Sequence, residues 1–116
     1  MIDPTAFAAE WIEAWNAHDL PRILSHYAPE IVFTSPAAAR ITGDASGRVQ
    51  GKAALEAYWA RALELAPDLA FTLRSVLSGP DAVAIRYFSS RTGAEVVEVL
   101  RFNAEGLAIE AAAYYE

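Results

Sequence analysis

One glutamate, Glu98, lies in an otherwise apolar stretch of the sequence and is the residue best suited to acid–base chemistry. The stretch 94–102 reads AEVVEVLRF, a pattern typical of a β-strand. Side chains alternate between the two faces of a strand, so Glu98 shares its face with Val96, Leu100 and Phe102. Because that face is apolar, we expect Glu98 to be buried and to be paired, hydrogen-bonded or protonated.

Few other residues belong to a recognisable catalytic motif. The sequence contains no cysteine and only two histidines, His18 and His26, which excludes thiolate chemistry and argues against a multi-histidine metal site. His18 precedes a helix-capping aspartate, and His26 lies near a helix end where a cation is favourable, so we assign neither to catalysis. No phosphate-binding glycine motif and no Ser-His-Asp order is present. We therefore predict no metal and no cofactor.

Size and charge narrow the class of protein. The chain has 116 residues and a net charge of −6 at pH 7, so we expect one domain, 1–116, with an acidic surface that disfavours nucleic acid as a partner. No basic run indicates a membrane surface, no apolar run is long enough to span a bilayer, and the N-terminus lacks signal-peptide features. We expect a cytoplasmic protein that does not contact a membrane.

Hydrophobic periodicity predicts the elements that position Glu98. In chain order we expect a helix at 5–17, a short helix that begins near Asp19 and ends before Pro29, a strand at 30–35, an irregular connection at 36–51, a helix at 52–66, and strands at about 69–77, 82–90, 94–102 and 107–115. This order is typical of an α+β fold in which helices cover one face of a curved antiparallel sheet. The connection at 36–51 is either a pocket lid or a mobile loop.

Both faces of the late strands are apolar, which is unusual for an antiparallel sheet with one solvated face. Val97 and Val99, for example, lie opposite Val96 and Leu100 on the same strand. Since the helices can cover only one face, we expect the outer face to form a homodimer. We expect the arginines of that outer face to pair with acids rather than with a ligand: Arg74, Arg86 and Arg101.

Three segments, taken with the element order, resemble the nuclear transport factor 2-like superfamily: WNAHDL at 15–20, YAPEIVF at 27–33 and GKAAL at 51–55. The chain is most similar to the SnoaL-like polyketide cyclase and ketosteroid isomerase-related branch, from about residue 5 to about residue 115. The resemblance implies a cone-shaped barrel, in which a strongly curved, mixed and mainly antiparallel sheet wraps around three helices and leaves a deep apolar pocket. It also implies dimerisation through the outer sheet face, as in many members.

The resemblance to ketosteroid isomerase implies positions for a tyrosine donor, an aspartate base and a protonated aspartic acid. This chain has Trp11, Ser35 and Glu98 at those positions. A serine hydroxyl is no base at neutral pH, so we expect the steroid isomerase reaction to be absent. Glu98 and Ser35 remain the catalytic candidates, and Ser35 would either bond a ligand carbonyl or bond the backbone beside Pro36.

The implied pocket makes inward-facing aromatic and apolar side chains candidates for ligand binding, although such residues also serve as plain core. The candidates are Trp11, Trp15, Phe33, Tyr58, Trp59, Tyr87, Leu100, Phe102 and Tyr115. The resemblance implies a protein that binds a small apolar or aromatic molecule and acts on it through Glu98 by isomerisation, cyclisation or hydration. The alternative is a non-catalytic ligand-binding or dimeric interaction module of the same fold. The sequence does not identify the ligand.

Overall fold

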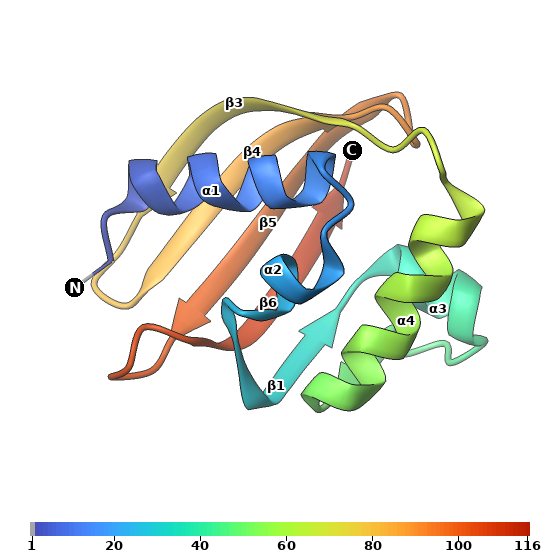
Figure 1. Ribbon diagram of the computed structural model, residues 1–116, viewed down its shortest axis with the longest axis horizontal. Helices are drawn as coiled ribbons and strands as arrows, with labels where there is room; N and C mark the ends of the chain where they lie inside the picture. Colours follow the sequence, from blue (N-terminus) through green and yellow to red (C-terminus); the bar gives the residue numbers. More distant parts are fainter. Residues whose placement is uncertain (1) are drawn as a thin grey trace.

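Four helices and a six-stranded sheet make up the computed structural model, which describes residues 2–116 (Figure 1). The helices are α1 (Pro4–Asn16), α2 (Leu20–Leu24), α3 (Pro36–Thr42) and α4 (Lys52–Leu65). The strands are β1 (Tyr27–Thr34), β2 (Arg48–Gln50), β3 (Phe71–Ser78), β4 (Ala82–Ser89), β5 (Ala94–Phe102) and β6 (Ala108–Tyr115). The predicted α+β class is confirmed.

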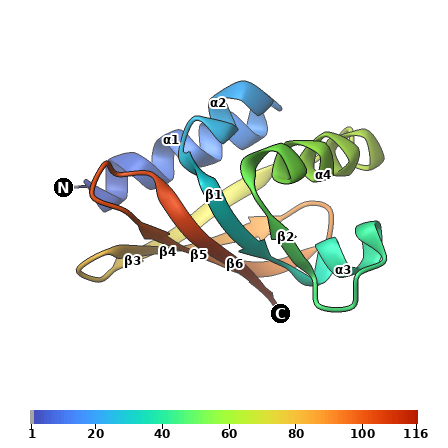
Figure 2. The same cartoon turned by 90° about the horizontal axis from the view of Figure 1, so that it is seen from below.

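The sheet has the strand order β2-β1-β6-β5-β4-β3. Strands β1 and β6 run parallel and all other neighbours run antiparallel, so the sheet is mixed and mainly antiparallel, as predicted. Figure 2 shows α1, α2 and α4 over one face of the curved sheet. The sheet stays open, because its edge strands β2 and β3 do not pair with each other. It is therefore a curved cone rather than a closed barrel.

Helices α1 and α2 begin where the sequence predicts. The carboxylate of Asp3 accepts a hydrogen bond from the Ala6 amide at 3.1 Å, and that of Asp19 accepts one from the Arg22 amide at 3.2 Å. Each cap satisfies an amide that the first helical turn leaves without a partner. Both helices pack their apolar sides over the sheet: α1 carries Trp11 and Trp15 into the core, and α2 carries Ile23 and Leu24.

The segment 36–51 corrects the sequence prediction, because it holds α3 and β2 instead of an irregular connection. The Ser35 hydroxyl accepts a hydrogen bond from the Ala37 amide at 3.1 Å, and Gly43 ends the helix with a φ of 80°, a conformation that glycine adopts without strain. Strand β2 then pairs with the end of β1. The fold consequently has four helices where three were expected.

Strand β1 also begins earlier than predicted, at Tyr27 rather than at residue 30. Its pairing with β6 shifts register between Tyr27 and Val32. Pro29 lies in that irregular stretch and has no amide hydrogen to give to a ladder, which explains why the pairing is interrupted there. The early start places Tyr27, which the sequence put in the preceding helix, fully buried beneath the helices.

Burial alternates along β4 and β5, with Val83, Ile85 and Tyr87 buried on one strand and Val96, Glu98 and Leu100 on the next. These side chains form the inner face that meets the helices. On the outer face the expected arginine pairs are present: Arg74 and Arg86 lie 3.4 Å from Glu95, and Arg101 pairs with Glu110. Between residues 2 and 116, no helix has the length and apolarity to cross a bilayer.

Candidate functional site

A cavity of about 280 Å³ lies between the helices and the inner face of the sheet. This volume is close to the lower end of the range for small-molecule sites, about 300 to 1,000 Å³. Most of the wall is aromatic or aliphatic, and four polar side chains interrupt it: Ser35, Ser89, Arg91 and Glu98. An apolar cavity with a few polar groups is suited to hold a flat organic molecule and to fix its orientation.

Glu98 lies in the middle of β5, between Ile85 of β4 and Ala113 of β6. Its side chain is buried, as predicted, with 4% exposed. One carboxyl oxygen, Oε1, accepts a hydrogen bond from the Tyr87 hydroxyl at 3.1 Å. The other oxygen has no hydrogen-bond partner among residues 2–116 and is not fully enclosed by protein, so it is available to a molecule in the cavity.

Burial raises the pKa of Glu98 to about 7, and the hydrogen bond from Tyr87 opposes this shift. Desolvation favours the neutral carboxylic acid, whereas a donated hydrogen bond favours the carboxylate. At neutral pH both protonation states of Glu98 are therefore populated. A carboxyl group in this condition can give a proton to a bound molecule or accept one from it.

Four further side chains lie near Glu98 or line the same cavity: Trp11, Trp15, Tyr27 and Tyr87. The indole Nε1 of Trp11 donates a hydrogen bond to the Tyr27 hydroxyl at 2.9 Å, so this donor is engaged within the protein. Burial, followed by the nearby Glu98 carboxylate, raises the pKa of both Tyr27 and Tyr87 well above the ordinary value. The indole N–H of Trp15 is buried without an acceptor among residues 2–116.

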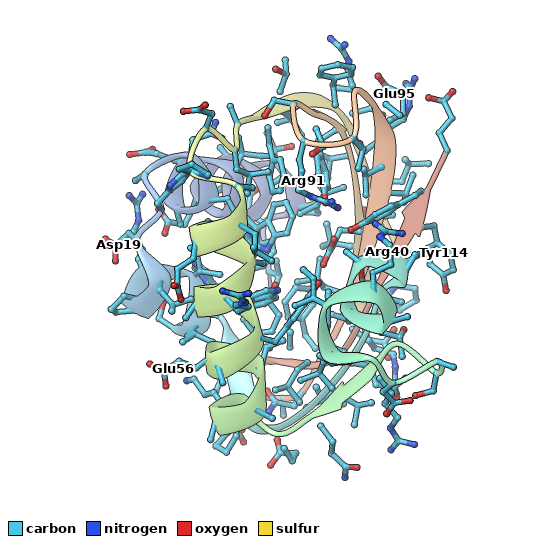
Figure 3. All side chains as sticks on the ribbon, turned by 90° about the vertical axis from the view of Figure 1, so that its right-hand side faces the viewer. Asp19, Arg40, Glu56, Arg91, Glu95 and Tyr114 are labelled. Atoms are coloured by element: carbon cyan, nitrogen blue, oxygen red, sulfur yellow. The ribbon has the colours of Figure 1, made fainter. Side chains whose placement is uncertain are left out.

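A second set of polar side chains in the cavity, Ser35, Tyr115 and Arg91, is connected by hydrogen bonds. The Ser35 hydroxyl lies 3.3 Å from the Tyr115 hydroxyl, to which Nη2 of Arg91 donates a hydrogen bond at 3.2 Å. Since Ser35 also caps α3, its hydroxyl bonds the backbone just beyond Pro36, which was one of the two alternatives for this residue. Figure 3 shows Arg91 between α4 and α3, and because Arg91 is exposed yet lines the cavity, it marks the rim.

Aromatic rings pack against one another around the cavity. The ring centroids of Phe71 and Tyr87 lie 4.3 Å apart, and those of Trp15 and Trp59 lie 5.0 Å apart in a T-shaped arrangement. Such pairs stabilise a core beyond the area they bury. Burial also raises the pKa of Tyr58, which faces this wall from α4, to about 12.

Most of the residues selected from the sequence come together in this cavity: Trp11, Trp15, Phe33, Ser35, Tyr58, Trp59, Tyr87, Glu98 and Tyr115. Two do not. Leu100 is fully buried in the core, and Phe102 packs its ring at 5.0 Å against Phe7 near the opposite end of the sheet. Both share the inward face of β5 with Glu98, but the cavity occupies only one end of that face.

Several cavity residues were not selected from the sequence. Ser89 continues the inward alternation of β4, and Phe71 lies opposite Ser89 on β3, so strand periodicity could have identified both. Ile41 belongs to α3, which was expected to be irregular. Arg91 lies in a hairpin turn, where no periodic signal indicates the direction of a side chain.

Neither histidine lines the cavity. Nε2 of His18 lies 2.8 Å from the Leu69 carbonyl oxygen, and Nε2 of His26 lies 3.2 Å from a carboxylate oxygen of Glu10. Across residues 2–116 no three potential metal ligands from His, Asp and Glu gather at one point. These contacts give the histidines structural roles, tying the helices to the connection before β3 and to each other.

The fold and cavity agree with the result of sequence comparison. The model of the SnoaL-like domain family matches residues 8–111, and the chain belongs to this family, within the nuclear transport factor 2-like superfamily. A SnoaL-like protein of unknown function from Burkholderia thailandensis E264 is 43% identical, with 97% of this chain and 93% of that chain covered and a TM-score of 0.93. No curated protein matches the chain significantly.

Two solved structures from Streptomyces share the fold at lower identity. AclR from Streptomyces galilaeus, a candidate hydroxylase, is 25% identical, with 97% of this chain and 88% of that chain covered and a TM-score of 0.73. IdmH from Streptomyces antibioticus, a candidate polyketide cyclase, is 21% identical, with 99% and 93% covered and a TM-score of 0.78. The fold is thus used by proteins of different chemistry, so function must be argued from the site.

Proposed function

We propose that the protein binds a small, largely apolar or aromatic molecule in its cavity and exchanges a proton with it through Glu98. The observation that carries this proposal is the position of Glu98: a buried carboxyl with a pKa of about 7 and one oxygen available to the cavity. Isomerisation, cyclisation and hydration are the reaction classes that one such group can support. The resemblance to IdmH in fold is consistent with cyclisation.

The contact with Tyr87 supports a proton-donor role for Glu98. When the neutral acid transfers its proton to a carbonyl or alkene of the bound molecule, a carboxylate remains in a desolvated position. The Tyr87 O–H, 3.1 Å from Oε1, donates to that carboxylate and stabilises it, because hydrogen bonds to ionised acceptors are stronger than those to neutral ones. The same carboxylate can then take back a proton from another atom of the molecule and restore the acid.

The alternative function is ligand binding without catalysis, and one observation favours it. Among residues 2–116, Glu98 is the only carboxyl group that lines the cavity, and the Ser35 hydroxyl is engaged as the cap of α3. A reaction that needs a separate acid and base would therefore lack one partner. The open cavity suits either function, but Glu98 has no arginine partner among residues 2–116, which leaves its carboxyl group free for proton exchange.

Native mass spectrometry of the purified protein should first identify a co-purified molecule, and its conversion should then be followed with the wild-type protein and with Glu98→Gln. The amide keeps the size of the acid but cannot exchange its proton, so we expect turnover to fall by about 10²- to 10⁴-fold with binding retained. Glu56→Gln is the matched control, because Figure 3 shows Glu56 on the far side of α4. Unchanged turnover in Glu98→Gln would contradict the role of Glu98, and binding without any turnover by the wild-type protein would favour the non-catalytic module.

We further propose that two copies associate through the outer sheet face, which no helix of residues 2–116 covers (Figure 2). Leu77 and Tyr114 support this proposal, because they are 62% and 61% exposed and both belong to strands of that face. Large exposed apolar side chains on one uncovered face are typical of an interface. A single domain over 1–116 and a cytoplasmic location also remain predictions.

A further inference from the structure

Arg91 lies at the rim of the cavity and has no acidic partner in the part of the chain that the structure describes. Four of the eight arginines pair with carboxylates: Arg22, Arg74, Arg86 and Arg101. Of the four that have no such pair within residues 2–116, Arg40, Arg48, Arg61 and Arg91, it is Arg91 that lines the cavity. Within residues 2–116, no carboxylate lies in ion-pair contact with Arg91, although the net charge is −6. Its contacts are with Tyr115, whose hydroxyl accepts from Nη2 at 3.2 Å and whose ring centroid lies 5.8 Å from the guanidinium carbon.

These contacts hold the guanidinium in place and leave most of its donors free. Arginine has several N–H donors in a planar fork and no acceptor, and residues 2–116 engage them with one hydrogen bond, to the Tyr115 hydroxyl. The Tyr115 hydroxyl accepts that bond, so its own O–H can donate, either to Ser35 at 3.3 Å or to a ligand. The rim of the cavity therefore presents free N–H donors of Arg91, and a Tyr115 O–H that can turn to a ligand.

We infer that the molecule bound in the cavity carries a carboxylate, which Arg91 and Tyr115 hold at the rim while the apolar body of the molecule lies inside. This inference rests on the proposed binding function. A guanidinium matches the planar, two-oxygen geometry of a carboxylate. A single cation favours one negative charge, and the acidic surface of the chain disfavours phosphates that carry two. A cavity of about 280 Å³ accommodates an aromatic body of about two rings.

The test compares two near-isosteric probes, 2-naphthoate and its neutral amide 2-naphthamide, by titration calorimetry at neutral pH. We expect the wild-type protein to bind 2-naphthoate about tenfold more tightly, because charge-assisted hydrogen bonds are stronger than neutral ones. Arg91→Met should weaken binding of 2-naphthoate by about tenfold and that of 2-naphthamide much less, because the amide offers the guanidinium one neutral acceptor instead of two charged oxygens. Arg61→Met is the matched control, because Arg61 is exposed on α4 and does not line the cavity; it should leave both affinities unchanged.

The outcomes separate this inference from the proposed function. If both probes bind but Arg91→Met does not change the ratio of their affinities, the inference is wrong and the binding function stands. If neither probe binds the wild-type protein, both are contradicted. Because Arg91 is exposed, its substitution should not disturb folding, and circular dichroism of each variant checks this.

Discussion

At the scale of residues, burial and the hydrogen bond from Tyr87 shift the pKa of Glu98 in opposite directions. Burial between β4, β6 and the helices favours the neutral acid, and the Tyr87 hydroxyl favours the carboxylate. These two effects together put the pKa of Glu98 near 7. A small change in its burial or in its hydrogen bond from Tyr87 therefore changes the fraction of Glu98 that is protonated at neutral pH. This balance also links the proton of Glu98 to the stability of the fold.

The pH dependence of stability should reflect this link. The pKa of Glu98 rises from an unfolded value of 4.5 to about 7 on folding, so its contribution to stability is present below about pH 4.5 and is lost as the pH rises through 7. Between about pH 5 and about pH 8, the free energy of unfolding of wild type should fall by about 2 to 3 kcal/mol more than that of Glu98→Gln. Urea denaturation at several pH values measures both curves.

Other groups do not obscure this comparison. The pKa of Glu10 is lowered to about 2 chiefly by its hydrogen bond from Arg22, so Glu10 titrates below the range of the experiment. His18 and His26 are present in both proteins and cancel in the difference. Parallel curves for the two proteins would show that burial of Glu98 does not favour its acid form.

The hydrogen bond from Tyr87 can be removed separately. Tyr87→Phe deletes the hydroxyl that stabilises the carboxylate, so the pKa of Glu98 should rise above its wild-type value. Since Oε1 loses its donor, the free energy of unfolding should fall by about 1 kcal/mol at neutral pH. Carboxyl NMR titration and urea denaturation measure the two effects, and an unchanged pKa would indicate that the contact does not act on Glu98.

At the scale of elements, most of the fold follows from periodicity, and the exceptions have physical causes. Helices α1 and α4 and strands β3 to β6 lie within a few residues of their predicted bounds, because long amphipathic patterns are local signals. Strand β2 has three residues and depends on pairing with β1. A local sequence pattern cannot predict such pairing. Helix α3 had local signals in Ser35, Pro36 and Gly43, but the glycines around it indicated a loop.

In the candidate site, too, the residues indicated by a local pattern could be predicted and those that depend on tertiary structure could not. Glu98, Tyr87 and Phe33 were identified because strand alternation fixes the face of each side chain. The extent of the cavity could not be predicted, since it depends on where helices and sheet diverge, and this is why Leu100 and Phe102, which share the inward face of β5, lie outside it. Arg91 could not be predicted as a cavity residue, because the geometry of its hairpin turn, and not a periodic pattern, sets the direction of its side chain.

Glycine substitutions test whether the packing of the 36–51 segment leaves room for an added Cβ atom. Gly43 and Gly47 both have positive φ, 80° and 66°, but a Cβ on Gly47 would lie 2.5 Å from the Ser35 carbonyl oxygen, whereas a Cβ on Gly43 meets nothing within 4 Å. Gly43→Ala should cost about 1 kcal/mol of unfolding free energy from backbone strain, and Gly47→Ala about 1 to 3 kcal/mol more. Thermal and urea unfolding measure both. Equal losses would mean that the segment relaxes around the added methyl group.

At the scale of the whole molecule, the curved sheet separates two surfaces. Its inner face meets the helices and encloses the cavity, whereas its outer face carries ion pairs and exposed apolar side chains. In Figure 3, Tyr114 lies on the side of the sheet away from α4. The separation means that association of two copies would leave the cavity rim at Arg91 accessible.

Light scattering after size exclusion tests the proposed association. We expect a mass of about twice the 12.6 kDa of one chain, because a standard interface of this kind buries enough apolar surface to persist at micromolar concentration. Tyr114→Glu should convert the dimer to a monomer by placing a charge in the interface. Ala57→Glu, an exposed position on α4, adds the same charge away from the sheet and should remain dimeric. A monomeric wild-type protein would contradict the proposal.

The measurement that tests the central claim most directly is the pKa of the Glu98 carboxyl in the folded protein. Its ¹³C chemical shift can be followed against pH, with Glu98→Gln used to assign the resonance. We predict a midpoint at about 7. A midpoint near 4.5, the ordinary value for a glutamate, would mean that Glu98 is fully ionised at neutral pH, and it would contradict the role of Glu98 as a proton donor in this cavity.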